Sequence, residues 1–277
     1  ARYLSEINDT WQPLVLTYNK SLTQYLKQKA RQIDLDIGRV RILHFHGWCH
    51  SLLAEAHLWP RDLLTHTRVL NVIRKVQQAI PEAKLFDEEF LLEEIQWLKG
   101  HRILDWETYR AVTRTGRGTG LLAEQRAIVF RVFQAYQREL QRLNACDWDD
   151  IPLRVLEGLE RGQIKGRRYH AILVDEAQDF WPTWFQVVLQ MLRPETNMLF
   201  MVADTAQKIY RPAFSWKELG IELRGHRVRV LKRSYRNTTE ILKTAYALIR
   251  DEEFLREEDG SVAEPELEYQ QARHGPL

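Results

Sequence analysis

The feature that most constrains the fold is the stretch AILVDEAQDF at residues 171–180. Four apolar residues run directly into two adjacent acids, Asp175 and Glu176, and a third acid, Asp179, follows. A short uninterrupted apolar run is typical of a strand that is buried on both faces, as in a parallel sheet. Ligands bind beyond the carboxyl ends of such strands. The stretch therefore predicts a buried strand that delivers paired carboxylates to a ligand site.

Strand signals occur on both sides of a long helical stretch. The expected strands are residues 14–17, 40–45, 170–174, 197–203 and 227–231. Helices are expected at residues 22–31, directly after the 40–45 strand, and at residues 182–192. Strands that alternate with helices form parallel sheets, because a parallel pair needs a long crossover connection. The pattern predicts an α/β fold with a parallel sheet and flanking helices.

Residues 59–158 lack strand signals. Several segments there carry apolar residues at three- and four-residue spacing, which is typical of amphipathic helices. RTGRGTG at residues 114–120 contains three glycines and indicates a turn or loop. An all-helical insertion therefore interrupts the sheet. The expected division is residues 1–57 for the first part of the sheet domain, 58–165 for the insertion, 166–251 for the second part and 252–277 for a charged linker.

Composition excludes several classes of protein. Of 277 residues, 44% are hydrophobic and 28% charged, which is typical of a soluble globular chain. The net charge of +2 means that any nucleic-acid surface must come from local clustering. Cys49 and Cys146 form no CxxC pair, so neither a zinc site nor a disulfide framework is indicated. No apolar run reaches the roughly 18 residues of a membrane span. We expect a cytoplasmic protein with no membrane partner.

The adjacent acids indicate a cation. Two neighbouring carboxylates repel each other and favour a cationic partner when they are partly buried. Mg²⁺ prefers oxygen ligands and usually retains waters while it bridges phosphates. One carboxylate would hold the metal and its neighbour would accept a proton from an attacking water. The alternative is a helix N-terminus, where acids in the first turn are stabilising without any ligand.

Several motifs extend this hypothesis. DEAQDF (175–180) closely resembles the Walker B motif of the UvrD/Rep-like superfamily 1 DNA helicases. Four further segments resemble motifs of that family in its order: LVLTYNKSL (14–22), LHFHGWCHSLL (43–53), MVADTAQKIYR (201–211) and LKRSYRNTTEI (231–241). RTGRGTGLL and NACDWDDIP also resemble parts of the family's insertion subdomain. The resemblance spans essentially the whole chain and implies a RecA-like parallel sheet interrupted by the insertion.

The resemblance also implies roles for individual residues at an ATP and Mg²⁺ site. Asp175 and Glu176 would ligate the metal, and Glu176 would also polarise the attacking water. Gln178 and Gln207 would sense the γ-phosphate, Arg236 would reach it, and Tyr235 would stack on adenine. Alternatives remain for two of these: Gln207 as an ordinary strand-end residue, and Arg236 as part of a solvated basic face, because the run at 224–236 holds no acid.

The same resemblance implies a single-stranded DNA surface. The residues it assigns there are Tyr18, Asn19, Phe45, His46, Tyr210, Phe214 and Trp216. Aromatic stacking on bases and polar contacts to the backbone are what such a surface needs. Tyr18 and Phe45 have the alternative role of core aromatics, and His46 that of a helix cap.

The sequence departs from the family pattern in several places. No GxxxxGK[ST] phosphate loop occurs in it, so the chain is expected to begin just after that loop. It is also expected to stop before the second RecA-like domain. Pro212 stands where many relatives have a stacking Trp, with Phe214 or Trp216 as substitutes. His44 replaces the usual Thr before Phe-His, and Ala203 replaces the usual Gly before Asp.

These features predict an ATP-dependent DNA helicase or translocase that moves 3′ to 5′ and is stimulated by single-stranded DNA. Its partners would be single-stranded and duplex DNA, the second RecA-like domain of the same protein, and repair or defence proteins. The isolated chain is expected not to hydrolyse ATP. The alternatives are a catalytically degenerate module that binds DNA or protein, or the motor of a helicase–nuclease or defence system.

Overall fold

The computed structural model describes residues 3–4, 8, 10–36, 38–114, 117, 120–203, 219–221, 229 and 238–249. Residues 1–203 form one compact unit and residues 204–277 form a second. The helix described in the second unit is α10 (Thr239–Ile249). The predicted strand at 227–231 lies outside the described residues, apart from Arg229.

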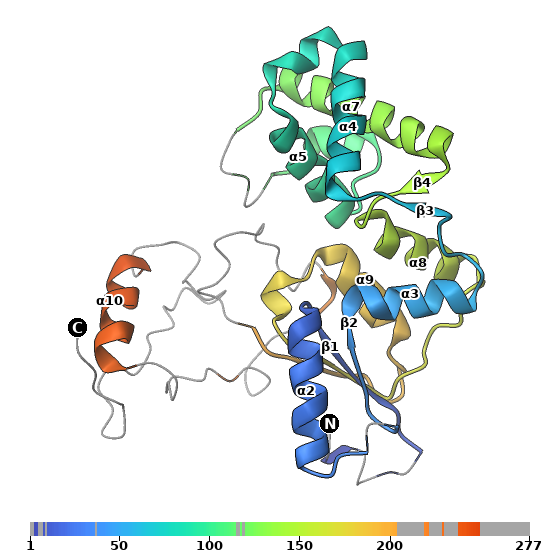
Figure 1. Cartoon of the computed structure of the whole chain (residues 1–277), viewed down its shortest axis with the longest axis vertical. Helices are drawn as coiled ribbons and strands as arrows, with labels where there is room; N and C mark the ends of the chain where they lie inside the picture. The colour runs from blue at the N-terminus through green and yellow to red at the C-terminus, as the bar shows by residue number, and fades with distance from the viewer. Residues whose placement is uncertain are drawn as a thin grey trace. The chain divides into compact units, whose positions relative to one another are not determined.

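The described part of the first unit is built on a four-stranded parallel sheet (Figure 1). The strand order is β2–β1–β5–β6. The strands are β1 (Pro13–Thr17), β2 (Arg41–His44), β5 (Ala171–Val174) and β6 (Met198–Met201). Each neighbouring pair is parallel. This confirms the predicted parallel α/β fold, and the four predicted strands that fall within the described residues differ from the observed ones only at their ends.

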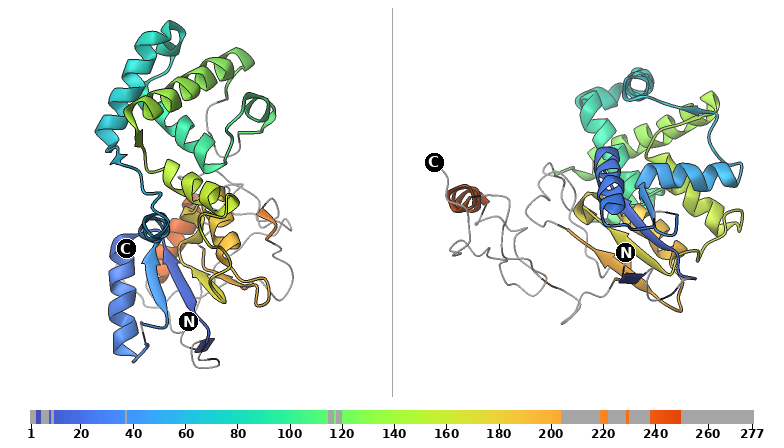
Figure 2. Two further views of the ribbon diagram at one scale, coloured as in Figure 1. Left: turned by 90° about the vertical axis from the view of Figure 1, so that its right-hand side faces the viewer. Right: turned by 60° about the horizontal axis from the view of Figure 1, so that its bottom comes forward.

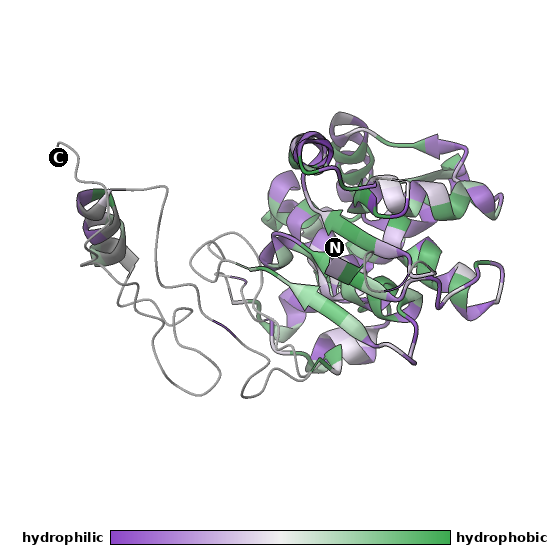
Figure 3. Cartoon of the chain, turned by 90° about the horizontal axis from the view of Figure 1, so that it is seen from below, coloured by the Kyte–Doolittle hydropathy of each residue, from purple (hydrophilic) through white to green (hydrophobic). Residues whose placement is uncertain are grey.

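Burial explains why the strands read as continuous apolar runs. The central strands β1 and β5 are covered on both faces, so Leu14, Leu16 and Ile172 are completely buried. In β6, one of the two edge strands of the described sheet, Phe200 is 61% exposed. Figure 3 shows the apolar strands crossing the middle of the unit, with helices of mixed polarity around them.

Helices follow the strands in sequence and pack around the sheet. Helix α2 (Lys20–Gln32) follows β1 and packs on β1 and β2. Helix α3 (Phe45–Glu55) begins directly after β2. Helix α9 (Pro182–Met191) starts with a proline, which is favoured at a first helical position because its missing N–H costs no hydrogen bond there. Helix α8 (Asp150–Glu160) packs on both α3 and α9.

The middle of the chain forms a separate helical block with its own core. Its elements are α4 (His66–Ala79), η1 (Pro81–Leu85), α5 (Glu88–Gly100), α6 (Trp106–Ala111) and α7 (Ala123–Leu143). Trp97, Tyr109 and Tyr136 are among the side chains buried at its centre. In the left view of Figure 2 these helices lie above the four-stranded sheet. The division at 57/58 and 165/166 remains a prediction.

The block also contains one element that the sequence pattern did not indicate. Residues Asp62–Leu63 (β3) and Ala145–Cys146 (β4) form a parallel pair of two residues each. The backbone N–H of Leu64 extends the pair by donating to the carbonyl of Cys146 over 2.8 Å. A strand of two residues is too short to show a period in sequence. The pair joins the chain entering the block to the chain leaving it.

Among the helices of the described residues, none is long and apolar enough to cross a membrane.

Candidate functional site

The carboxyl ends of three neighbouring strands meet at one edge of the sheet. Thr17 ends β1 and lies opposite His44, which ends β2. Val174 ends β5 opposite Leu16. The backbone N–H of Asp175 continues that ladder by donating to the carbonyl of Leu16 over 2.9 Å. The predicted acids therefore follow a central strand, at the edge where open parallel sheets bind ligands.

Asp175 is half-buried, and its surroundings raise the pKa of its carboxyl. Burial raises the pKa of its carboxyl, and the negative charge of Glu176 raises it further. The backbone N–H of Glu176 lowers the pKa by donating to Oδ1 over 3.0 Å, but this contact does not cancel the increase. Burial and the neighbouring negative charge thus disfavour the ionised carboxylate. A cation bound here would supply the compensating positive charge.

Glu176 turns the chain sharply after the strand. Its φ of 53° lies in the left-handed region, which is uncommon for a residue with a side chain and costs about 1–3 kcal/mol. The short helix η2 (Ala177–Asp179) follows at once. The buried side chain of Gln178 donates from Nε2 to Oε2 of Glu176 over 2.6 Å. Strained residues of this kind cluster at functional sites.

The donor set fits a hydrated magnesium ion better than a fully protein-ligated metal. No group of three or more His, Cys, Asp or Glu that could hold a metal occurs among the described residues. Asp175 and Glu176 supply two carboxylates from consecutive positions. Mg²⁺ is commonly held by one or two carboxylates, with waters and substrate phosphates completing its octahedron. These two residues are therefore the ones that could hold it.

A stack of aromatic rings lies at the carboxyl ends of β1 and β2. The Trp184 ring on α9 stacks on Phe45 with centroids 4.3 Å apart and an interplanar angle of 6°. It also stacks on Tyr18, with centroids 5.8 Å apart and an angle of 19°. Tyr18 is 40% exposed, whereas Phe45 is completely buried. Tyr18 thus caps an aromatic column whose inner rings belong to the core.

The predicted DNA contact of Phe45 requires correction. Its ring meets Trp48, Phe180 and Trp184 and leaves no exposed face on which a base could stack. The alternative interpretation, a core aromatic, describes its position in this structure. Sequence pattern alone could not decide between the two roles because both place an aromatic residue at the start of the helix.

The capping role considered for His46 was also wrong. The N-cap of α3 is His44, whose Nδ1 accepts a hydrogen bond from the backbone N–H of Gly47 over 2.7 Å. A Cβ at position 47 would lie 2.6 Å from the His44 ring, so a larger residue there would displace the capping ring. His46 instead presents its half-buried ring edge-on to Trp184, with centroids 4.8 Å apart.

Asn19 has a structural role at the site. It is the N-cap of α2, and its Oδ1 accepts from the backbone N–H of Ser21 over 2.7 Å. The residue is exposed, so its predicted contact with DNA stays a prediction.

Two tryptophans near this edge were not identified from the sequence. Trp184 joins Tyr18 to Phe45, as described above. Trp148 lies just before α8, is 48% exposed, and meets His46 edge-on with centroids 5.4 Å apart and an angle of 90°. The only available signal for Trp148 was an aromatic residue inside the acidic run DWDD. Ring contacts therefore run from Tyr18 through Trp184 and His46 to Trp148.

Several predicted site residues cannot be placed. Those outside the described residues are Gln207, Tyr210, Phe214, Trp216, Tyr235 and Arg236. Their assigned roles stay predictions.

The parallel sheet, its covering helices and the paired acids at the end of β5 place the first unit in the RecA-like α/β class. Comparison with known families makes the assignment specific. Residues 2–213 match the UvrD/REP helicase N-terminal domain. The chain belongs to this family, as the motifs predicted.

Individual relatives agree with the family assignment. The chain is 26% identical over 259 residues to ATP-dependent DNA helicase UvrD2 of Mycobacterium bovis, covering 86% of this chain and 36% of the relative. It is 24% identical over 271 residues to DNA helicase II of Salmonella typhimurium, and the match covers 89% of this chain and 35% of the relative. It is 24% identical over 263 residues to ATP-dependent DNA helicase PcrA of Bacillus subtilis, and the match covers 87% of this chain and 33% of the relative. The chain spans about a third of the length of these relatives.

Proposed function

We propose that this chain is the first motor domain, with its helical insertion, of an ATP-dependent DNA helicase that translocates 3′ to 5′ on single strands. The family assignment and the names of the relatives support the general activity. The single observation that carries the chemistry is the pair Asp175 and Glu176, in a strained turn at the end of a central parallel strand.

In the proposed reaction, Asp175 supplies a ligand to Mg²⁺ and Glu176 accepts a proton from the water that attacks the γ-phosphate. The metal, when bound, would neutralise charge on the phosphates. Gln178 holds the Glu176 carboxylate through its amide, which limits the directions in which Glu176 can face. Gln207 and Arg236 are proposed to contact the γ-phosphate, and Tyr235 to stack on adenine.

Single-stranded DNA would lie over the aromatic edge of the sheet. Tyr18 and Trp148 offer exposed rings, and His46 lies between Trp148 and Trp184. Stacking of bases on aromatic rings contributes about 1–3 kcal/mol per base and tolerates any sequence, which suits a translocating motor. We also propose that residues 1–277 alone do not hydrolyse ATP, since they contain no GxxxxGK[ST] sequence.

The test is ATP hydrolysis by the complete protein, measured with and without a single-stranded oligonucleotide, together with strand displacement on duplexes that carry a 3′ or a 5′ overhang. We expect hydrolysis that the oligonucleotide stimulates, and displacement that requires the 3′ overhang. DNA binding without any ATP turnover would contradict the proposal and identify a binding module instead.

A further inference from the structure

A buried cluster of charges joins the helical block to the start of α8. The Lys99 side chain, in the last turn of α5, is completely buried. Its Nζ lies 2.6 Å from Oδ2 of Asp147 and 2.6 Å from Oδ1 of Asp150. The hydroxyl of Tyr136 also donates to Oδ2 of Asp147, over 2.7 Å. One ammonium group thus joins the end of α5 to the turn that precedes α8 and to the first residue of α8.

The three charges depend on one another. Burial alone would lower the pKa of Lys99, but the charges of Asp147 and Asp150 raise it above its usual range. Burial opposes ionisation of Asp147, yet Lys99 and Tyr136 hold the pKa of Asp147 below its usual value. Burial and the charge of Asp147 raise the pKa of Asp150. Removing Lys99 would leave two buried acids without a cation, so the turn would have to rearrange.

The acidic turn carries Trp148 on its outer side. Oδ1 of Asp147 accepts from the backbone N–H groups of Asp149 and Asp150 over 3.0 and 2.9 Å. Oδ2 of Asp150 accepts from the backbone N–H of Asp147 over 3.1 Å. The carboxylates that bind Lys99 therefore also close the turn, which fixes the backbone from which the exposed Trp148 ring projects toward His46.

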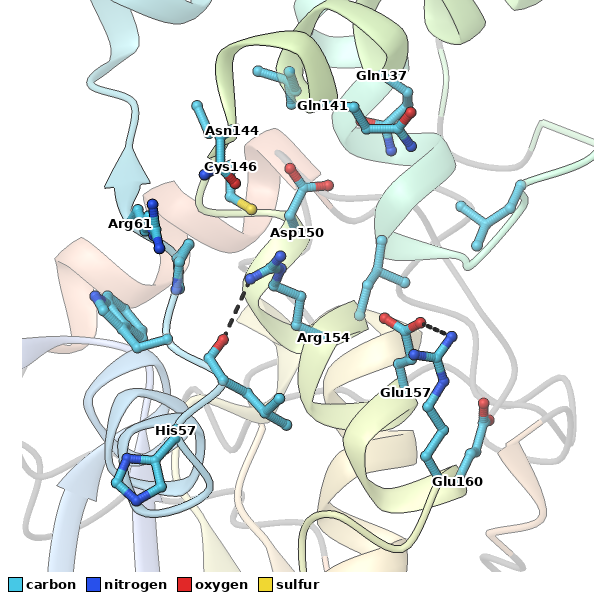
Figure 4. A pocket seen from close by; sticks show the side chains of 18 of the residues that line it. His57, Arg61, Gln137, Gln141, Asn144, Cys146, Asp150, Arg154, Glu157 and Glu160 are labelled. Carbon is cyan, nitrogen blue, oxygen red and sulfur yellow. Dashed lines mark hydrogen bonds and ion pairs between the residues drawn. The ribbon is translucent and has the colours of Figure 1, made fainter.

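A cavity borders the acidic turn. A cavity of about 910 Å³ lies between the end of α7, α8 and residues 57–61. Asp150 and Cys146 line it, and Figure 4 shows Asp150 at its wall together with Asn144 and Arg154. Lys99 supplies the positive charge that holds the Asp150 carboxylate at this wall.

The backbone of the same lysine contacts α9. The buried hydroxyl of Thr183 donates to the carbonyl of Lys99 over 2.8 Å and also to the carbonyl of Gly100. A Cβ at position 100 would lie 2.5 Å from the Trp181 ring, so the end of α5 fits closely against the start of α9. Thr183 directly precedes Trp184, the inner ring of the aromatic column.

We propose that Lys99 is a positioning residue that holds Trp148 at a fixed distance from Trp184, so that the helical block and the sheet present one surface to single-stranded DNA. Its ammonium group orients the Trp148 turn, and its carbonyl anchors the first turn of α9. This inference rests on the proposed function only in naming single-stranded DNA as the ligand. The restraint on Trp148 is a property of the chain itself.

The experiment uses the full chain with Lys99→Met, and Lys99→Arg as the conservative variant. Lys75→Met is the matched control, because Lys75 pairs with Glu139 at 2.6 Å on the surface of the same block. All forms are labelled with 5-fluorotryptophan, and Trp148→Phe assigns the Trp148 fluorine signal. Binding of a fluorescent oligo-dT is measured by anisotropy at one salt concentration, because phosphate contacts are salt-dependent.

Lys99→Met is expected to shift or broaden the Trp148 fluorine signal and to weaken oligo-dT binding by about tenfold, within the range that one base stack contributes. Lys99→Arg should restore most of the wild-type Trp148 signal and oligo-dT affinity. Lys75→Met should leave the signal and the affinity at wild-type values. If Lys99→Met does not fold, Asp150→Asn replaces it, and the same two changes are expected with smaller amplitude.

An unchanged Trp148 signal and unchanged affinity in a folded Lys99→Met or Asp150→Asn chain would overturn the inference. The fluorine signal is read without DNA. A wild-type chain that fails to bind oligo-dT would therefore count against the proposed DNA surface, while the signal still decides whether Lys99 positions Trp148.

Discussion

The side-chain amide of Gln178 donates a hydrogen bond to the carboxylate of Glu176, with Nε2 2.6 Å from Oε2. Gln178 is buried, whereas Glu176 sits in a left-handed turn next to Asp175. The proposed proton acceptor is therefore oriented by the residue that the family pattern assigns to sensing the γ-phosphate. Gln178 would act in catalysis first by holding Glu176.

Replacing Gln178 by Ala tests this role in the complete protein. Loss of a hydrogen bond to a charged group costs about 1.5–3 kcal/mol, so kcat for ATP hydrolysis should fall by about tenfold or more while KM changes little. Gln190→Ala, an exposed position on α9, is the control. An unchanged kcat, or a change confined to KM, would contradict the orienting role.

His44 should make stability depend on pH. Burial, with Lys20 and Lys27 nearby, lowers the pKa of His44, and its Nδ1 accepts from Gly47 only when it is not protonated. The folded state therefore binds fewer protons than the unfolded state, whose His pKa is about 6.5. This contribution to stability is present above that value and is lost as the pH falls through the lowered folded pKa.

The measurement is the free energy of unfolding by urea between pH 7.5 and 5.5. His44→Thr keeps a side-chain acceptor at the N-cap but does not titrate. We expect a shallower loss of stability toward acid pH in His44→Thr than in the wild type. Equal slopes in the two proteins would show that His44 does not titrate as the structure implies.

The exposed rings beside the sheet should contribute to binding of single-stranded DNA. Tyr18→Ala and Trp148→Ala are each expected to weaken oligo-dT binding by about 1–3 kcal/mol, because each removes a stacking surface. Tyr25→Ala is the matched control, since Tyr25 is 54% exposed on α2 outside the aromatic column. Equal effects of the three substitutions on affinity would contradict the assigned surface.

Glu94 should be essential to the stability of the helical block. Its buried carboxylate accepts from Nε and a terminal nitrogen of Arg114 over 2.7 and 2.6 Å, and from the hydroxyl of Tyr109 over 2.8 Å. Glu94→Gln would leave Arg114 buried without its anion, which costs roughly 3–5 kcal/mol.

The neighbouring Glu93 provides the control for that change. Its side chain is 61% exposed and pairs with Arg117 at 2.9 Å. Glu93→Gln should change the free energy of unfolding by no more than about 1 kcal/mol. A loss in Glu94→Gln no larger than that in Glu93→Gln, measured by urea unfolding, would contradict the importance of the buried pair.

The sheet and the acids were predictable because their signals are local. A continuous apolar run marks a buried parallel strand, and the acids of DEAQDF follow it directly in sequence. The family motifs then placed Tyr18, Asn19 and His46 at the same edge. Their positions follow from strand ends that the alternation of strands and helices already indicated.

The features that sequence did not predict depend on distant contacts. Lys99 pairs with Asp147, which lies 48 residues further along the sequence. The residues next to Lys99 in sequence do not indicate that its side chain is buried. The burial of Phe45 follows from its stack on Trp184, which comes from a later helix. His44 became the cap because Gly47 leaves room for its ring. The predicted roles of Gln207, Tyr235 and Arg236 lie beyond the described residues and stay predictions.

The central claim is that β5 delivers Asp175 and Glu176 to a magnesium–nucleotide site. The most direct measurement compares Glu176→Gln with wild type in the complete protein, with ATP turnover and nucleotide affinity measured separately in the presence of oligo-dT. The exposed Glu195→Gln serves as the control. Loss of a general base predicts that turnover falls by about 10²- to 10⁴-fold while affinity stays within a few-fold of wild type. Turnover in Glu176→Gln equal to that of Glu195→Gln would contradict the claim.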